Sequence, residues 1–246
     1  MSKVKRVYTF GDKKAEGGAD MKNLLGGKGA NLAEMCLLGL PVPAGFTITT
    51  DTCTEYYEND NQLPEGLMDD VWAAMKQTEQ IMGMKYGDSE NPLLMSCRSG
   101  ARSSMPGMMD TVLNIGLCSA TIPGIIKKTG NARFVWDSYR RLIMMYADVV
   151  MEKAEGLDSA EGKGIRKQLD EMLDEYKHGK GFNSDTELSA EDLKTLAEMF
   201  KDRIKKAIGR EFPDDANDQL IGSIKAVFKS WNGKKAVSYR RIEGIP

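Results

Sequence analysis

Two segments of the chain carry residue types whose spacing suits phosphate binding. In the first, Gly26, Gly27 and Gly29 surround Lys28. Glycine lacks a Cβ atom, so a backbone built from it approaches a ligand closely. A helix expected to begin near Ala30 would direct free N–H groups at an anion. The segment predicts a phosphate-binding loop; the alternative is a flexible turn with an exposed lysine.

This glycine segment matches neither of two common nucleotide motifs. A Walker A loop requires Ser or Thr where the chain has Gly29, and Gly where it has Lys22. The dinucleotide fingerprint requires a third glycine where the chain has Leu32. The prediction therefore depends on the glycines, the lysine and the helix start.

The second segment, residues 97–111, follows a short apolar run. We expect Arg98 to end a strand there and to point into a cleft, because its planar guanidinium fork suits phosphate oxygens. The alternative is a surface hairpin with two solvated arginines. The other residues of this segment that we assign to the phosphate site are Ser99, Arg102, Gly107 and Asp110.

The remaining reactive side chains give weaker signals. Arg140 and Arg141 are neighbours in a predicted helix, where consecutive residues diverge by about 100°, so both cannot face one ligand. His178 has no partner at ligand spacing, and no zinc site is expected. The four cysteines form no CxxC pair, and we interpret them as free buried thiols.

The elements that must position these residues change in type along the chain. In the first half, strands and helices alternate, whereas the apolar spacing after Cys118 is helical. Ser189 and Asp192 have the spacing of a capping box at a helix start. Strands are expected at 4–10, 46–50, 93–98 and 111–116, helices at about 30–39, 65–84, 134–150, 165–179, 189–204 and 217–231, and an extended or strand-like tail at 236–245.

This pattern predicts an α+β fold. We expect one mixed sheet to carry the glycine segment and the Arg98 strand. The expected domains are an α/β nucleotide-binding lobe, residues 1–117 plus 210–246, and an inserted helical subdomain, residues 118–209.

Composition limits the partners. The chain has 246 residues, a formal net charge of −2 and 28% charged residues of both signs spread along it. This balance argues against a nucleic-acid surface or a polybasic membrane surface. No stretch is apolar enough to cross a bilayer, and no hydrophobic signal core follows the first residues. We expect a cytoplasmic protein with no nucleic-acid or membrane partner.

Taken together, these segments resemble the N-terminal ATP-binding region of the pyruvate, phosphate dikinase family. The resemblance is carried by residues 23–35, 97–114 and 137–141, and also by 226–231 and 239–241. It extends along nearly the whole chain.

The resemblance implies an ATP-grasp-like domain that binds ATP with Mg²⁺. In this family the β-phosphate of ATP passes to a histidine on a phosphohistidine domain, which carries it to a separate domain where pyruvate becomes phosphoenolpyruvate. Inorganic phosphate accepts the γ-phosphate. By motif match, Lys28 and Arg98 correspond to residues that contact nucleotide phosphates, and Gly107 to a loop over them. Arg141 corresponds to a further phosphate-site arginine.

The chain lacks other parts of the family's pattern. The family's histidine lies in a Thr-x-Ser-His motif, which is absent. The residues that hold Mg²⁺ and the pyruvate domain are expected beyond Pro246, and the apolar run ending there suggests a cut. We therefore expect a monomeric fragment without turnover of its own, with ATP and the remaining dikinase domains as partners.

Two alternatives remain at this stage. A phosphoenolpyruvate synthase-type dikinase or a related antibiotic phosphotransferase shares the glycine–lysine segment and the strand-end arginine, although residues 105–111 resemble the phosphate-using enzyme more closely. Outside the enzymes, the helical second half fits a non-catalytic interaction module. ATP binding that depends on Arg98 would separate that module from the dikinases.

Overall fold

The computed structural model describes residues 4–157 and 163–245, so Pro246 lies outside the described part. The chain divides into two compact units, each made of segments distant in sequence. The expected domains, a lobe of residues 1–117 plus 210–246 and a helical subdomain of residues 118–209, were drawn from the change in secondary structure along the sequence. This division stays a prediction. Unit 1 comprises Met1–Tyr86, Arg98–Asp110 and Val227–Pro246, and unit 2 comprises Gly87–Cys97 and Thr111–Ala226.

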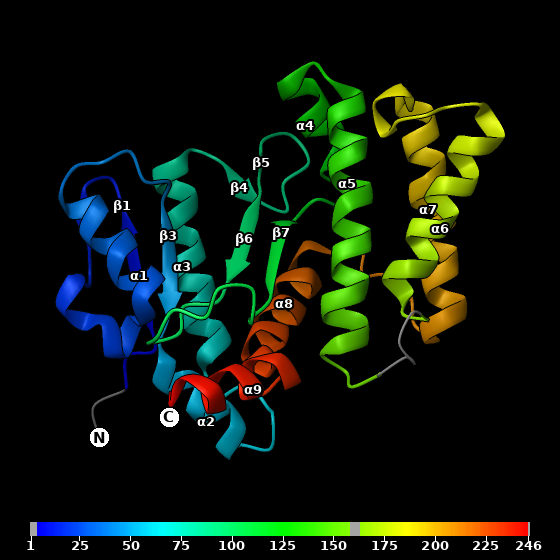
Figure 1. Cartoon of the computed structure of the whole chain (residues 1–246). Coiled ribbons are helices and arrows are strands. Elements are labelled where there is room, and N and C mark those ends of the chain that lie inside the picture. The colour runs from blue at the N-terminus through cyan, green and yellow to red at the C-terminus, as the bar shows by residue number, and fades with distance from the viewer. Residues whose placement is uncertain (1–3, 158–162, 246) are drawn as a thin grey trace. The chain divides into compact units, whose positions relative to one another are not determined.

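Unit 1 is built on a small antiparallel sheet with the strand order β2–β1–β3. Helices α1 and α3 both pack against this sheet (Figure 1). The elements of unit 1 are β1 (Val7–Gly11), β2 (Lys14–Ala15), η1 (Ala19–Met21), α1 (Lys22–Leu37), β3 (Gly45–Ile48), α2 (Thr50–Glu58), α3 (Leu67–Met82), β4 (Lys85–Tyr86) and α9 (Lys234–Glu243).

The spacing of apolar residues explains α3. Leu67, Val71 and Met75 recur every four residues and are buried at 0–2% exposure. Such spacing places them on one face of a helix. Gly83 ends the helix in a left-handed conformation with φ of 62°. The helix expected at 65–84 is therefore confirmed.

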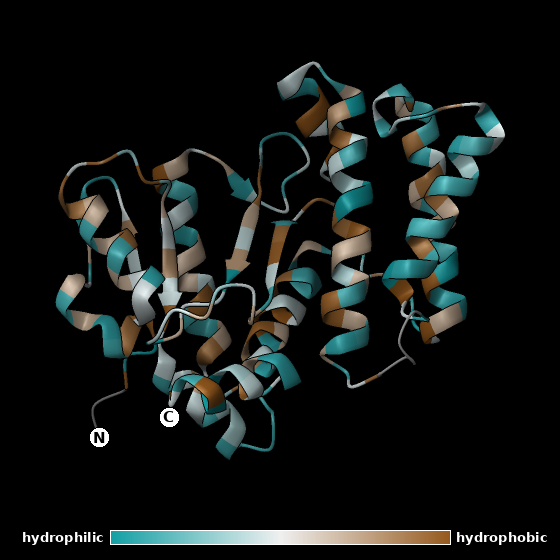
Figure 2. Ribbon diagram, viewed as in Figure 1, coloured by the Kyte–Doolittle hydropathy of each residue, from teal (hydrophilic) through white to brown (hydrophobic). Residues whose placement is uncertain are grey.

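Unit 2 is mainly helical. Helices α5, α6 and α7 lie side by side (Figure 1), and Figure 2 shows both hydrophobic and hydrophilic residues on each of them. An amphipathic helix carries the first on one face and the second on the other. The elements of unit 2 are β5 (Pro92–Leu93), β6 (Met95–Arg98, whose last residue begins a unit 1 segment), β7 (Thr111–Ile115), α4 (Ile122–Thr129), α5 (Ala132–Tyr146), η2 (Ala147–Lys153), α6 (Ile165–Lys180), η3 (Asp185–Glu187), α7 (Ala190–Ile208) and α8 (Ala216–Ser230, which continues into unit 1).

The start of α7 confirms the predicted capping box. The Ser189 hydroxyl accepts a hydrogen bond from the Asp192 N–H at 3.1 Å, and the Asp192 carboxylate accepts one from the Ser189 N–H at 3.0 Å. Two N–H groups that the helix leaves unpaired are satisfied in this way.

Replacing the cap should weaken the protein measurably. We expect Ser189→Ala to lower the free energy of unfolding by about 1 kcal/mol in urea titrations, whereas Ser189→Thr keeps most of the stability.

Hydrogen bonds from the Ser189 hydroxyl and N–H, and from Lys180, hold the pKa of Asp192 below its usual range. Stabilisation by a carboxylate of lowered pKa is complete above its ordinary value, about 4, and is lost below it. Between about pH 4 and pH 2, Ser189→Ala should therefore lose stability less steeply; equal slopes would contradict this assignment.

Three expectations about the elements need correction. The tail expected to be extended is α9, a helix. The single mixed sheet is not found among the described residues: β1–β3 form an antiparallel sheet, and β6, which ends at Arg98, pairs with β7 in another. The long helix expected at 134–150 changes at Ala147 into the π-helical segment η2. The α+β class itself is confirmed.

Candidate functional site

The glycine segment and the Arg98 segment meet backbone to backbone in unit 1. Gly26 interrupts α1 with φ of 68° and ψ of 167°, a conformation that residues with a side chain rarely adopt. A Cβ atom at Gly26 would lie 1.3 Å from the carbonyl oxygen of Gly100. Only glycine fits this contact, and the contact joins the two segments that the sequence assigned to phosphate.

The helix start differs from the expected one. Helical structure is present from Lys22 and resumes directly after Gly26, so the helix begins before Ala30. The Gly27 N–H donates a hydrogen bond to the carbonyl of Ala101 at 3.0 Å. The Gly27 N–H is therefore bonded to the second segment and is not free for an anion.

Gly29 has a packing role. A Cβ atom there would lie 2.7 Å from the Thr47 methyl carbon in β3. The missing side chain lets α1 approach the sheet, which holds the glycine segment in place.

Two cations close to this junction in sequence are unpaired. Lys28 and Arg98 are both exposed, and neither side chain makes a hydrogen bond or ion pair with any described residue. Their charges are thus free to meet an anion. The argument for a site depends on the joined segments that carry these two exposed side chains.

Arg102 lies in the same loop but has partners. Its Nη2 lies 3.0 Å from the Asp51 carboxylate and 3.3 Å from the Thr50 hydroxyl. Thr50 in turn donates to the Asn23 carbonyl at 2.6 Å. These bonds tie the start of α2 to the Arg98 segment and to the first turn of α1. Because exposed ion pairs are worth at most about 1 kcal/mol, a bound anion can compete for Arg102.

The other assigned residues of the loop differ in environment. Ser99 is buried at 7% exposure. Gly107 is exposed with φ of 72°, and a Cβ atom there would have nothing within 4 Å. Asp110 is partly exposed. Gly107 therefore serves a turn and no close contact within the described residues, which leaves its face open to a ligand.

Arg141 lies in unit 2, on α5. Its Nε donates to Asp137 Oδ2 at 2.9 Å, and its side chain is 62% exposed. Arg140 donates to the other oxygen, Oδ1, at 2.6 Å, and its side chain is 3% exposed. The expected divergence of the two arginines is confirmed, while a phosphate-binding role for Arg141 stays a prediction.

Possible metal ligands and the cysteines among the described residues were the other candidates for chemistry. No group of three or more His, Cys, Asp or Glu side chains among them is arranged to hold a metal ion. All four cysteines are free; Cys36 and Cys118 are buried as expected, whereas Cys53 and Cys97 are partly exposed. Burial raises the pKa of Cys53 to about 11 and of Cys97 to about 12, so both thiols are protonated at neutral pH and react poorly.

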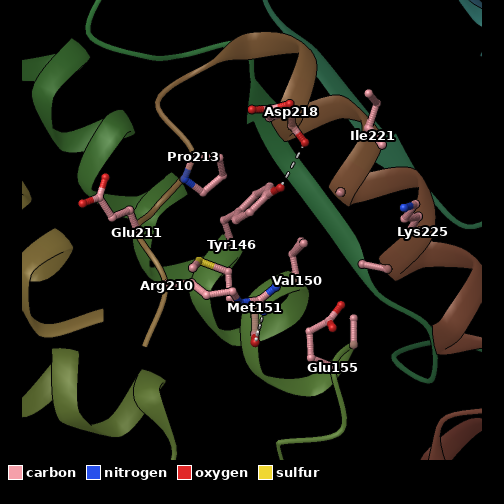
Figure 3. Close-up of a pocket in the computed structure, with 13 residues that line it drawn as sticks. Tyr146, Val150, Met151, Glu155, Arg210, Glu211, Pro213, Asp218, Ile221 and Lys225 are labelled. Atoms are coloured by element: carbon pink, nitrogen blue, oxygen red, sulfur yellow. Dashed lines mark hydrogen bonds between the residues drawn. The ribbon is translucent and has the colours of Figure 1, made fainter. Parts of the chain in front are cut away.

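Unit 2 contains a separate cavity of about 310 Å³ (Figure 3). The Tyr146 hydroxyl donates to the Asp218 carbonyl at 3.4 Å inside it. Arg210 and Lys225 line it together with acidic side chains, so its charge favours no anion. The residues assigned to the phosphate site do not line this cavity. Those residues are Lys28, Arg98, Gly26, Gly27, Gly29, Ser99, Arg102, Gly107, Asp110 and Arg141.

Sequence reasoning missed Thr50 and Asp51, because it missed α2. A signal was present: the Thr49 side chain caps the helix by accepting from the Thr52 N–H at 3.3 Å, and Asp51 occupies the first turn.

Within the described parts of the chain, no helix combines the length and apolar character needed to span a membrane.

Comparison with known proteins confirms the resemblance. A family model described as "Pyruvate phosphate dikinase, AMP/ATP-binding domain" matches residues 22–67 and 59–246. "Pyruvate, phosphate dikinase" of Clostridium symbiosum is 51% identical over 244 residues, 99% of this chain and 26% of that protein. The Rhizobium meliloti (strain 1021) protein of the same name is 48% identical over 243 residues, which are 99% of this chain and 26% of that protein. "Pyruvate, phosphate dikinase, chloroplastic" of Flaveria pringlei is 48% identical over 242 residues, which are 98% of this chain and 24% of that protein. The chain thus spans about a quarter of the length of these relatives.

Proposed function

Because the chain belongs to the pyruvate phosphate dikinase AMP/ATP-binding domain family, we propose that unit 1 forms part of an ATP-phosphate site. The observation that carries the proposal is the Gly26–Gly100 contact, which holds two phosphate-directed segments together. Exposed, unpaired Lys28 and Arg98 lie beside this contact in sequence.

The chemistry of the proposed site is electrostatic. Phosphoryl transfer places charge on the transferred oxygens, and positioned cations offset it. Lys28 offers a point charge and Arg98 a planar fork, whereas Arg102 must first release Asp51. The glycines at 26, 27 and 29, with Ser99, Gly107 and Asp110, would shape the backbone around the phosphates. For Arg141, which lies in unit 2, a phosphate-binding role is proposed by motif match alone.

The wider proposal is that the chain is an ATP-grasp-like part of a complete dikinase. That enzyme would interconvert ATP, pyruvate and phosphate with AMP, phosphoenolpyruvate and pyrophosphate through a phosphohistidine. The chain spans about a quarter of its relatives, so the histidine and pyruvate domains would be partners supplied elsewhere. Alone, the chain should show no turnover.

Magnesium enters this proposal as part of the substrate, MgATP. The described residues form no cluster that fits a metal ion, so its protein ligands would come from other parts of the enzyme. A cytoplasmic location also stays a proposal. It is supported by the four free cysteines, since reducing compartments keep thiols unpaired.

The alternatives have less support. The relatives named above are phosphate-using dikinases, which favours that type over a phosphoenolpyruvate synthase. A purely non-catalytic helical module would not need the Gly26–Gly100 contact or the unpaired cations beside it.

Amide hydrogen exchange tests the proposed location. With saturating MgATP, we expect slower exchange in residues 26–29 and 99–107, because bound phosphates would accept hydrogen bonds from these segments and hold them closed. The middle of α3 serves as the internal control and should not change. Protection confined to α3 or to unit 2 would contradict the proposed location.

A further inference from the structure

We propose that Asp137 is a positioning residue, which holds Arg141 with its two terminal amino groups turned to solvent, ready to bind an anion of the phosphate class. The inference rests on the proposed function, because it concerns a residue assigned to the phosphate site. It adds a role for Asp137, a carboxylate of segment 137–141 to which the sequence analysis assigned no role.

Asp137 connects an anchored arginine to an exposed one. Its Oδ1 accepts bonds from Arg140 Nη2 at 2.6 Å and Nε at 3.1 Å, and its Oδ2 accepts from Arg141 Nε at 2.9 Å. Arg140 is fixed further by the Asp185 carboxylate at 3.3 Å and by the Met144 sulfur at 3.4 Å. The buried Arg140 thus fixes the carboxylate, and the carboxylate fixes the orientation of Arg141.

Arg141 uses only one edge of its guanidinium. Beyond the Nε bond to Asp137, its side chain makes no hydrogen bond or ion pair with any other residue in the described parts of the chain. Both terminal amino groups therefore remain available, and a guanidinium held at Nε presents them together to two oxygens of one phosphate group.

The charge of Asp137 gives the inference a sharp test. Burial raises the pKa of its carboxyl, but hydrogen bonds and charges from Arg140 and Arg141 outweigh burial and keep that pKa below its usual range. The carboxylate is therefore negative at neutral pH and opposes anion binding through space. If Asp137 only diluted the charge of Arg141, Asp137→Asn would tighten anion binding. If Asp137 positions Arg141, the same change weakens it.

The experiment uses the 246-residue chain and inorganic tripolyphosphate as the probe. Nitrogen-15 NMR follows the Arg141 Nε–H signal during titration. We expect a saturable shift in the wild type, and a loss of affinity of about 2- to 12-fold in Asp137→Asn, the range expected when a free side chain must be ordered on binding. The Arg141→Ala spectrum lacks this signal, which assigns it to Arg141.

The matched control is Asp170→Asn on α6. Arg166 and Asp170 also form an i, i+4 pair through Nε, in the reverse chain order, with Nε 3.1 Å from Oδ2 and side chains that are half exposed. Affinity should not weaken in this control. If Asp137→Asn does not fold, Asp137→Glu retains the charge but moves the carboxylate, and it should weaken binding in the same range.

Three results would overturn the inference: no shift of Arg141 in the wild type, tighter binding in Asp137→Asn, or unchanged affinity in the Asp137 variant that folds. Failure of the proposed function appears elsewhere, as MgATP binding that does not depend on Lys28 or Arg98 in unit 1. The two failures are therefore distinguishable.

Discussion

Replacing Gly26 with alanine should lower the free energy of unfolding by about 4 kcal/mol and abolish MgATP binding. The added methyl group would lie 1.3 Å from the Gly100 carbonyl oxygen. The obstacle is backbone, so it cannot rotate aside as a side chain would. The φ of 68° with ψ of 167° adds strain for any residue with a Cβ atom. Urea titration measures the loss of stability.

Gly39→Ala is the matched control. Gly39 also has a positive φ, 78°, but a Cβ atom there would meet nothing within 4 Å. We expect a cost of about 1 kcal/mol, from the left-handed conformation alone. Equal losses in the two variants would mean that the Gly26–Gly100 contact does not hold the two segments together.

The second large effect is expected at Arg140. Arg140→Met should lower the free energy of unfolding by about 3 kcal/mol, because it removes the shared cation from Asp137 and Asp185. Methionine keeps much of the arginine's apolar volume, so the loss reports mainly the ion pairs. Thermal and urea unfolding would both show it.

Its neighbour provides the control. Arg141→Met changes the same residue type on the same helix, but at a side chain that is 62% exposed. We expect a change within about 0.5 kcal/mol. An equally small effect at Arg140 would contradict a structural role for the buried pair and weaken the anchor that the Asp137 inference requires.

Local sequence patterns predicted the local parts of this structure well. The capping box at Ser189, the amphipathic spacing of α3 and the strands before and after residues 99–110 each depend on near neighbours. The divergence of Arg140 and Arg141 also follows from helix geometry alone.

Features that depend on distant contacts could not be predicted in this way. The tail has a mixed apolar pattern that fits a strand, yet it folds as α9, where the Arg240 guanidinium lies 3.9 Å from the centre of the Trp231 ring. Only Ala236 of this helix is buried, so the sequence has no apolar stripe from which a helix could be predicted. The contact of Gly26 with Gly100 likewise has no local signal beyond the glycines themselves.

The candidate site shows the same division. Residue types near Lys28 and Arg98 indicated phosphate, and this stays a prediction; both side chains are exposed and unpaired among the described residues. Sequence could not show that Asp51 occupies Arg102 or that Ala101 occupies the Gly27 N–H, because both bonds join segments remote in the chain.

Calorimetric titration of MgATP into the wild-type chain and an Arg98→Ala variant tests the central claim most directly. Lys76→Ala is the control, since Lys76 is an exposed cation of unit 1 without a side-chain partner among the described residues. We predict saturable binding that Arg98→Ala weakens roughly 10- to 100-fold, the worth of a charge-assisted hydrogen bond, and that Lys76→Ala leaves unchanged. Binding unaffected by Arg98→Ala, or no binding to a well-folded wild-type chain, would contradict a phosphate site formed in unit 1.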